Sequence, residues 1–194
     1  MKNASVRIVP KQNGQEIRYS VSDENVRTAG GIPVFGLYPD WLNTVEVEYD
    51  RVFNGKTEHF SDRYQLYAAP VFLRSNGTPG QTHTTFNVKV LKMDPAFKDR
   101  LYFINNLIPT PPDASRVVWN NPMGGALEWA FGPENAIVDS TGTVRWYLNP
   151  DVEMYDPDQP YKAGIMMGFE QTADGGLLFG YGQRYAKYDM TGRE

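Results

Sequence analysis

The chain has 194 residues, of which 13% are aromatic, with 18 glycines, 14 prolines and no cysteine. This composition favours many short strands over long helices, and the lack of cysteine excludes disulfides, thiolate catalysis and cysteine metal sites. A net charge of -4 offers no basic surface to nucleic acid or anionic lipid, and no stretch has the roughly 20 apolar residues that cross a bilayer. We therefore expect a β-rich protein without nucleic-acid or membrane partners.

Two β-hairpins are predicted in the N-terminal third. Residues 5–10 and 17–21 are short β-like runs separated by an Asn-Gly pair, which suits a tight turn. Residues 44–49 alternate apolar and polar side chains, the pattern of a strand with one buried and one wet face. An Asn-Gly-Lys turn at 54–56 then returns the chain through residues 63–69.

The segments around these hairpins are interpreted by their polarity. Residues 23–30 read as a polar connection, and residues 73–83 as a Gly-rich surface loop. The apolar run 31–38 predicts a strand, which belongs at a sheet edge or a strand start because Pro33 has no N–H to donate. Residues 84–93 alternate again and predict a further strand.

A short helical turn and a strand complete the first predicted domain. Asp94-Pro95 has the form of an N-cap followed by proline at the first helical position, and residues 101–104 resume an apolar strand. About seven short strands then precede residue 106, enough for an antiparallel β-sandwich. The proline-rich stretch 105–122 is the best linker candidate, so we predict a β-sandwich domain over residues 1–108.

The rest of the chain, residues 109–194, reads as strands joined by tight turns. Apolar runs at 136–138 and 144–148 flank one turn, and the stretch 163–192 contains three short strands with an Asp-Gly turn between the first two. A further run at 127–130 precedes them.

One internal repeat suggests the architecture of this second part. The pattern D-x-T-G occurs at residues 139–142 and 189–192, a separation of 50 residues, which matches one four-stranded blade of a β-propeller. We therefore predict that residues 109–194 form the start of a propeller. One or two blades cannot close the ring, because a propeller typically needs at least four, so this domain is expected to be incomplete.

No residue pattern in the chain points to an active site or a metal site. His59 and His83, the two histidines, lack metal-ligand spacing and read as ordinary surface residues. Gly180-Tyr181-Gly182 is too short for a phosphate cradle and is better explained as a strand break. One acidic loop offers oxygen ligands for Ca²⁺ but lacks the EF-hand spacing, so a solvated loop is favoured. The loop contains Asp151, Glu153, Asp156 and Asp158.

Two further features have an ordinary explanation. An aromatic cluster might be used to stack on a sugar or a phenol, but sandwich and propeller cores use such residues routinely, so core packing is favoured. It consists of Trp119, Trp129, Trp146 and Tyr147. Glycosylation sequons begin at Asn3 and Asn76, and they matter only in a eukaryotic secretory pathway.

Four co-linear segments resemble the bacterial periplasmic aryl-sulfate sulfotransferases. They read IPVFGLY at residues 32–38, FKDRLYFIN at 97–105, VDSTGTVRWYL at 138–148, and the closing stretch at 163–194. The resemblance covers the N-terminal portion of that family. It is clear over residues 32–49 and 88–194 and thin over residues 1–26 and 54–85.

The resemblance implies an all-β chain: an N-terminal antiparallel β-sandwich followed by the first blade or blades of a six-bladed propeller. It also implies a homodimeric periplasmic enzyme that moves a sulfuryl group from an aryl sulfate donor to a phenolic acceptor without a nucleotide donor or other cofactor. The family uses a transiently sulfurylated histidine, assisted by further histidines and an arginine. These residues lie downstream of this chain, so no catalytic, cofactor-binding or metal residue is carried over to it.

The chain is accordingly expected to be a fragment of such an enzyme and inactive alone. Its N-terminus, MKNASVRIVP, lacks the apolar segment of a signal peptide, so the periplasmic location is implied by the resemblance alone. The alternative is a non-catalytic β-sandwich that serves as a binding or dimerisation module.

Overall fold

The computed structural model describes residues 1–71, 73–74, 82–83, 88–109, 131–148, 167–181 and 184–193. Strands predominate among them, beside one α-helix and one 3₁₀ helix, which confirms the prediction of an all-β fold. The chain divides into two compact units. The first contains Met1–Val71, Asn87–Tyr102 and Ile137–Trp146, and the second contains Phe72–Phe86, Phe103–Ala136 and Tyr147–Glu194. The boundary at residue 108 stays a prediction, because residues 110–130 lie outside the described part.

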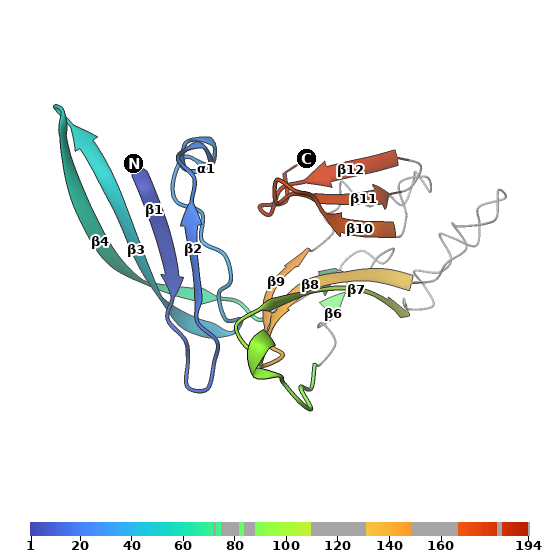
Figure 1. The fold of residues 1–194 in the computed structure, drawn as a ribbon. Coiled ribbons are helices and arrows are strands. Elements are labelled where there is room, and N and C mark those ends of the chain that lie inside the picture. The colour runs from blue at the N-terminus through green and yellow to red at the C-terminus, as the bar shows by residue number, and fades with distance from the viewer. Residues whose placement is uncertain are drawn as a thin grey trace. The chain divides into compact units, whose positions relative to one another are not determined.

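The first unit is built on a four-stranded antiparallel sheet (Figure 1). Its strands are β1 (Lys2–Ile8), β2 (Ile17–Val21), β3 (Trp41–Phe53) and β4 (Lys56–Ala68), in the order β2-β1-β3-β4. Both predicted hairpins are therefore confirmed. The turn between β3 and β4 has positive φ at both central residues, 50° at Asn54 and 75° at Gly55, as a two-residue hairpin turn of the primed type requires.

One side of this sheet carries the hydrophobic core of the first unit. Residues that face one another across antiparallel strands lie on the same side of a sheet, and the register pairs Val6 with both Tyr19 and Val47. The buried cluster on this side consists of Ala4, Val6, Ile8, Ile17, Val21, Val26, Tyr38, Val45 and Val47. It draws on β1, β2 and β3 but not on β4. The described residues thus form one covered sheet, and the second sheet of the predicted sandwich is not confirmed.

Residues 23–30, interpreted as a polar connection, instead form helix α1 (Asp23–Ala29). The Ser22 side chain caps it by accepting a hydrogen bond from the N–H of Asn25 at 3.1 Å, and Gly30 ends it with φ of 69°. Two acidic residues occupy the first turn, where the helix dipole favours negative charge. Val26 is the buried residue that packs the helix on the sheet.

The apolar run 31–38 is not a strand, so that prediction was wrong. Its backbone groups bind side chains instead of a neighbouring strand. The Tyr19 hydroxyl donates to the Pro33 carbonyl at 3.0 Å and accepts from the N–H of Phe35 at 2.6 Å, and burial raises the pKa of Tyr19 to about 12. The N–H of Tyr38 donates to the Asn43 side chain at 2.8 Å. These hydrogen bonds satisfy backbone groups of a half-buried segment that pairs with no strand.

The strand predicted over residues 84–93 is also absent from residues 88–93, which have no regular structure, while 84–87 lie outside the description. Val90 and Leu91 are 37% and 86% exposed, so these apolar side chains do not pack in a core that would stabilise a strand. The cap that follows is confirmed. The Asp94 side chain accepts from the N–H of Ala96 at 2.9 Å and opens the 3₁₀ helix η1 (Pro95–Phe97).

The remaining strands form three small sheets (Figure 1). β5 (Leu73–Arg74) pairs with β6 (Thr82–His83), within the stretch predicted to be a loop. A second sheet has the order β7-β8-β9, and a third the order β10-β11-β12. Their bounds are Leu101–Pro109, Phe131–Asp139, Val144–Leu148, Met167–Gln171, Leu177–Tyr181 and Arg184–Tyr188. The three predicted C-terminal strands are confirmed, Gly180 and Tyr181 continue β11 rather than break it, and a four-stranded propeller blade is not confirmed.

The two copies of the D-x-T-G pattern fold into the same turn. The Asp139 carboxylate accepts from the N–H and hydroxyl of Thr141 at 2.9 and 2.6 Å and from the N–H four residues on at 3.1 Å. The Asp189 carboxylate makes the same three bonds, from Thr191 at 2.7 and 2.5 Å and from the N–H four residues on at 3.1 Å. The glycine of each copy has φ near 85° or 82°. The repeat is therefore present in the structure as well as in the sequence.

The side of the N-terminal sheet opposite the core is charged. Arg7 binds Glu16 and Glu46 there, each at 2.7 Å. The hydrogen bond from Arg7 holds the pKa of Glu46 below its ordinary value. A polar outer side of this kind is usual for an antiparallel sheet that is covered on one side only.

We expect acid to weaken the first unit partly through Glu46. Because its folded pKa lies below the unfolded value of about 4.3, the ionised carboxylate stabilises the fold above that value, and this contribution is lost as pH falls through the folded pKa. The Glu46→Gln variant should therefore have a lower urea midpoint than the wild type at pH 7, with the difference shrinking toward pH 3. Glu48→Gln, an exposed residue on the same side, is the control. A difference that stays constant with pH would contradict this assignment.

Candidate functional site: a buried arginine cluster

The most densely bonded polar group of the described residues surrounds Arg145 on β9, which is 4% exposed. Its Nη1 donates to the Asp139 carboxylate at 2.7 Å and to the Gln15 carbonyl at 3.1 Å, and its Nε donates to the Gly36 carbonyl at 2.9 Å. Its guanidinium carbon lies 3.6 Å from the centre of the Tyr38 ring, a cation–π contact at close range. All five residues belong to the first unit.

Tyr38 and Gln15 extend this cluster into the N-terminal segment. The Tyr38 hydroxyl donates to the Gln15 carbonyl at 2.7 Å. The Gln15 side-chain oxygen accepts from both the N–H and the hydroxyl of Ser140 at 2.8 Å, and its amide nitrogen donates to the Arg100 carbonyl at 3.3 Å. Segments more than 100 residues apart in sequence are thus joined by hydrogen bonds.

Three glycines make room for the cluster. A Cβ on Gly14 would lie 2.3 Å from the Tyr38 hydroxyl, and one on Gly36 would lie 2.7 Å from Ile17. Gly142, in the turn after Asp139, has φ of 85°, and its Cβ would lie 2.7 Å from the Val88 carbonyl. A larger residue would have to displace the Tyr38 ring at Gly14, the Ile17 side chain at Gly36 and the Val88 backbone at Gly142.

The burial of this cluster decides what it can do. The side chains of Arg145 and Asp139 are 1% and 0% exposed. The Nε and Nη1 donors of Arg145 are directed to backbone carbonyls and a carboxylate of the same unit, whereas its buried Nη2 has no hydrogen-bond partner among the described residues. A substrate would have to displace these bonds to reach the guanidinium. We therefore assign the cluster to holding segment 137–146 against the N-terminal sheet. The sequence signal for it is an arginine inside the apolar run VRWYL, six residues after Asp139.

The two histidines are not brought together with this cluster. The His59 side chain is 65% exposed and its Nδ1 lies 2.9 Å from Asp50, on the charged side of the sheet. Hydrogen bonds from Asn3 and His59 hold the pKa of Asp50 below its ordinary value. His83 lies in β6, and its side chain is outside the description. His59 thus fits the prediction of a surface histidine.

The other candidates of the sequence lie partly outside the described residues. The acidic loop 149–160 does, as do Trp119, Trp129 and the second sequon. Trp146 and Tyr147 are half-buried on β9. In the part of the chain that the structure describes, no group of three or more acidic or histidine side chains is placed to hold a metal ion. No helix among the described residues has the length and apolar character of a membrane span.

Comparison with known proteins assigns both parts of the chain to one family. A family model described as the Arylsulfotransferase Ig-like domain matches residues 1–69, and one described as Arylsulfotransferase (ASST) matches residues 87–194. The second match alone covers more than half of the chain. The two matched ranges follow one another in the order expected from the resemblance of the sequence motifs.

Two curated bacterial relatives agree. Arylsulfate sulfotransferase AssT of Lelliottia amnigena is 32% identical over 197 residues, covering 94% of this chain and 32% of the relative. Arylsulfate sulfotransferase AssT of Escherichia coli O6:H1 (strain CFT073) is 31% identical with the same coverage. The chain spans about one third of the length of these relatives. The resemblance seen in the sequence is thereby confirmed, and the chain belongs to the arylsulfotransferase family.

Proposed function

We propose that this chain is the N-terminal part of an enzyme that transfers a sulfuryl group from an aryl sulfate to a phenol, working as a homodimer in the bacterial periplasm. The observation that supports this most is the pair of family matches, which together cover residues 1–69 and 87–194. Both relatives carry the name arylsulfate sulfotransferase.

The proposed chemistry has two displacement steps at sulfur. A histidine nitrogen attacks the sulfur of the donor, the bond from sulfur to the aryl oxygen breaks, and a phenolate leaves. The acceptor phenol then gives its O–H proton to a base such as the departed phenolate, and its oxygen attacks the same sulfur. The bond from nitrogen to sulfur breaks, and free imidazole is restored. Cationic groups and hydrogen-bond donors stabilise the negative charge on the sulfuryl and phenolate oxygens.

We place this histidine beyond the segment described here. His59 forms an exposed pair with Asp50. Among the described residues, no buried cation contacts His59 that could stabilise sulfuryl oxygens. The one buried arginine of the described part, Arg145, is bound to a carboxylate and two carbonyls. The contribution of this chain is therefore architectural: a covered sheet, and the first strands of the domain that would hold the reaction.

A chimera tests the proposal. Residues 1–194 replace the matched third of the Lelliottia amnigena relative, and transfer from a chromogenic aryl sulfate to a phenol is measured. We expect transfer by the chimera and none by the relative lacking that third. A folded chimera with no transfer above a no-protein control would contradict the proposal.

The alternative is a non-catalytic dimerisation module, and one observation favours it: large apolar side chains are exposed along β3 and β4. If the chain is a module of this kind, variants that abolish its self-association should leave the transfer activity of the chimera unchanged. The two candidates are thus separated by measuring transfer and self-association on the same variants.

A further inference from the structure

Two Asn-Gly pairs lie in turns of the described chain, and their surroundings differ. Asn13-Gly14 lies between β1 and β2, and Asn54-Gly55 lies between β3 and β4. Both asparagines are exposed and have positive φ, 59° and 50°. Asparagine followed by glycine readily loses its side-chain amide, because glycine has no Cβ to keep its backbone nitrogen away from the asparagine side chain. The two pairs therefore compare the same dipeptide in two environments.

The reaction uses the backbone nitrogen of the glycine. Once this nitrogen gives its proton to water or hydroxide, it attacks the asparagine Cγ, the bond from Cγ to Nδ2 breaks, and ammonia leaves as a cyclic succinimide forms. Water then opens the ring to aspartate, or to isoaspartate in which the main chain runs through Cγ. In sum, an amide and water become a carboxylic acid and ammonia, so no oxidant or reductant is needed.

At Asn13-Gly14 this nitrogen is occupied. The N–H of Gly14 donates to the Lys11 carbonyl at 2.8 Å. The glycine is also closely packed, because a Cβ there would clash with the Tyr38 hydroxyl, and the next residue, Gln15, is buried in the arginine cluster. Attack by the Gly14 nitrogen requires loss of its hydrogen bond and opening of a packed turn, which costs free energy.

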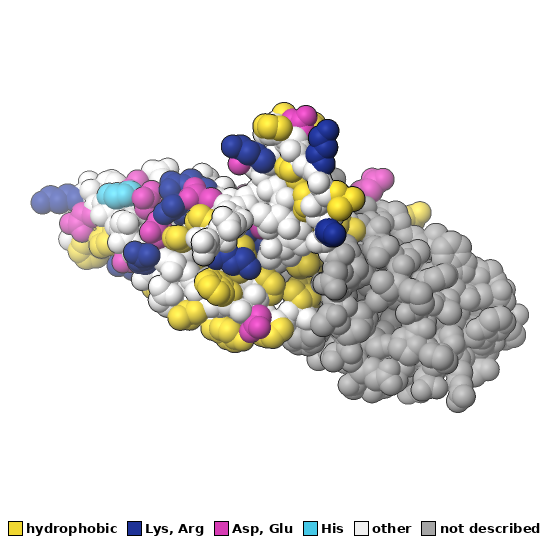
Figure 2. Space-filling view, turned by 90° about the horizontal axis from the view of Figure 1, so that it is seen from below, with side chains coloured by type: hydrophobic (Ala, Val, Ile, Leu, Met, Phe, Trp, Pro, Cys, Tyr) yellow, Lys and Arg dark blue, Asp and Glu magenta, His cyan; other side chains and the backbone are white. Residues whose placement is uncertain are grey.

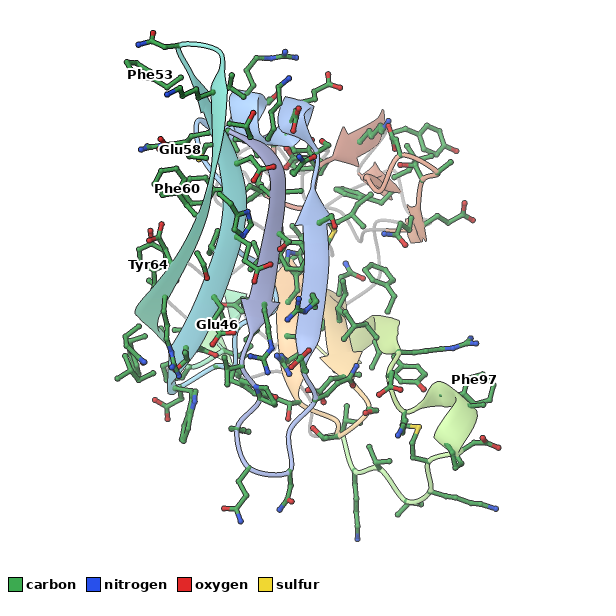
Figure 3. All side chains as sticks on the ribbon, turned by 60° about the vertical axis from the view of Figure 1, so that its left-hand side comes forward. Glu46, Phe53, Glu58, Phe60, Tyr64 and Phe97 are labelled. Carbon is green, nitrogen blue, oxygen red and sulfur yellow. The ribbon has the colours of Figure 1, made fainter. Side chains whose placement is uncertain are left out.

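At Asn54-Gly55 the nitrogen is accessible. The turn is closed by the pairing of Phe53 with Lys56, and the N–H of Gly55 has no acceptor among the described residues. A Cβ on Gly55 would have nothing within 4 Å. Figure 3 shows Phe53, the neighbour of Asn54, at the free end of the hairpin. Both reacting groups of this pair are therefore open to water.

The end of this hairpin also moves more easily than the other turn. β1 pairs with β3 no further than Asp50, so residues 51–58 form an arm of two strands. Val52 and Phe53 are 54% and 75% exposed on it, and the arm supplies nothing to the buried cluster. A two-stranded ribbon without a core is marginally stable in water. Local opening can thus bring Asn54 into the geometry for ring closure while the rest of the sheet stays folded.

The charges at the end of the hairpin favour the reaction. Asn54 lines an open depression together with Arg51, Lys56 and Glu58, so two positive charges and one negative charge lie around it. Positive surroundings stabilise the anionic nitrogen and the oxyanion that forms at Cγ. Figure 2 shows Lys and Arg side chains interspersed with Asp and Glu over the N-terminal sheet. The product carboxylate therefore joins a surface that already carries both charges.

We propose that Asn54 is a site of spontaneous deamidation in this chain, and that the fold protects Asn13 in the same dipeptide. The product carries one more negative charge than the starting chain. In its isoaspartate form the turn is one backbone atom longer, so that Phe53 and Lys56 no longer pair as they do here. The modification acts on the arm and leaves the core of the sheet intact. It does not depend on sulfuryl transfer, so its test is independent of the proposed function.

Ageing of the full 194-residue chain at mildly alkaline pH tests the site. Every sample carries Asn76→Ser, because the Asn-Gly pair at 76–77 lies outside the described residues. Peptides are mapped by mass spectrometry, and we expect Asn54 to be converted at least about tenfold faster than Asn13. Asn54→Gly, which suits the positive φ of the turn, should abolish the more acidic form seen by ion exchange. Equal conversion, or faster conversion at Asn13, overturns the proposal.

The same measurement in urea separates the effect of the fold from that of the sequence. Both pairs are exposed in the unfolded chain, so we expect Asn13 and Asn54 to react there at similar rates. The rate at Asn13 should then rise at least about tenfold on unfolding, because the packed turn no longer protects it. A rate at Asn13 that stays low in urea would assign the difference to the flanking sequence and overturn the proposal.

Discussion

Replacing Arg145 by methionine is expected to destabilise the first unit by about 3–5 kcal/mol, because removal of one partner leaves a buried charge uncompensated. The Asp139 carboxylate is 0% exposed and would lose its bond at 2.7 Å. The Gln15 and Gly36 carbonyls would lose their donors as well. The quantity to measure is the free energy of unfolding in urea, followed by tryptophan fluorescence.

Two comparisons isolate the cause. Arg18→Met removes an arginine whose side chain is 56% exposed and 3.9 Å from Glu16, and it should cost less than about 1 kcal/mol. The double variant Asp139→Asn with Arg145→Met should be destabilised by less than the sum of the two single changes. The reason is that Asp139→Asn removes the buried carboxylate charge that Arg145→Met alone leaves unpaired. If Arg145→Met costs no more than Arg18→Met, the contacts of Arg145 with Gln15, Gly36 and Tyr38 do not hold segment 137–146 in place.

A chain ending at residue 108 is expected to be less stable than the 194-residue chain, by on the order of 3 kcal/mol. It keeps the four-stranded sheet but loses Arg145, Asp139 and Ser140. The carbonyls of Gln15 and Gly36 then lose charge-assisted donors, and the ring of Tyr38 loses the guanidinium 3.6 Å from its centre. The urea midpoint of the short chain should be lower.

A chain ending at residue 148 serves as the control, because it retains the whole cluster and should recover most of the loss. If the chain ending at 108 unfolds at the same midpoint as the longer ones, residues 1–108 are an independent domain, as their sequence predicts, and the cluster contributes little. This comparison therefore tests the predicted domain boundary and the role of the cluster together.

Local turn chemistry explains what could be predicted from the sequence. The Asn54-Gly55 turn and the Asp174-Gly175 turn lie between apolar runs, and both hairpins form. Asp94 followed by proline marks a helix start that the structure confirms. In each case the information lies within a few adjacent residues, so no distant contact is needed to interpret it.

The errors have physical causes of their own. Ser22 and the two acidic residues after it are typical of a helix start. Only one of the seven residues of α1 is buried, so the sequence lacks the repeat of apolar residues by which a helix is predicted. Residues 31–38 have the composition of a strand, yet their partners are the side chains of Tyr19, Asn43 and Arg145. Those contacts cross up to 109 residues of sequence, which no local pattern records. The same holds for the Arg145 cluster itself.

The most direct test of the central claim is a sulfuryl-transfer assay on the 194-residue chain alone. A chromogenic aryl sulfate and a phenol are supplied, and release of the donor phenol and formation of the new aryl sulfate are followed. Because the chain supplies architecture and the reacting histidine is placed beyond it, we predict no transfer above a no-protein control. Transfer well above that control, lost on replacing His59 and His83 by glutamine, would contradict the account.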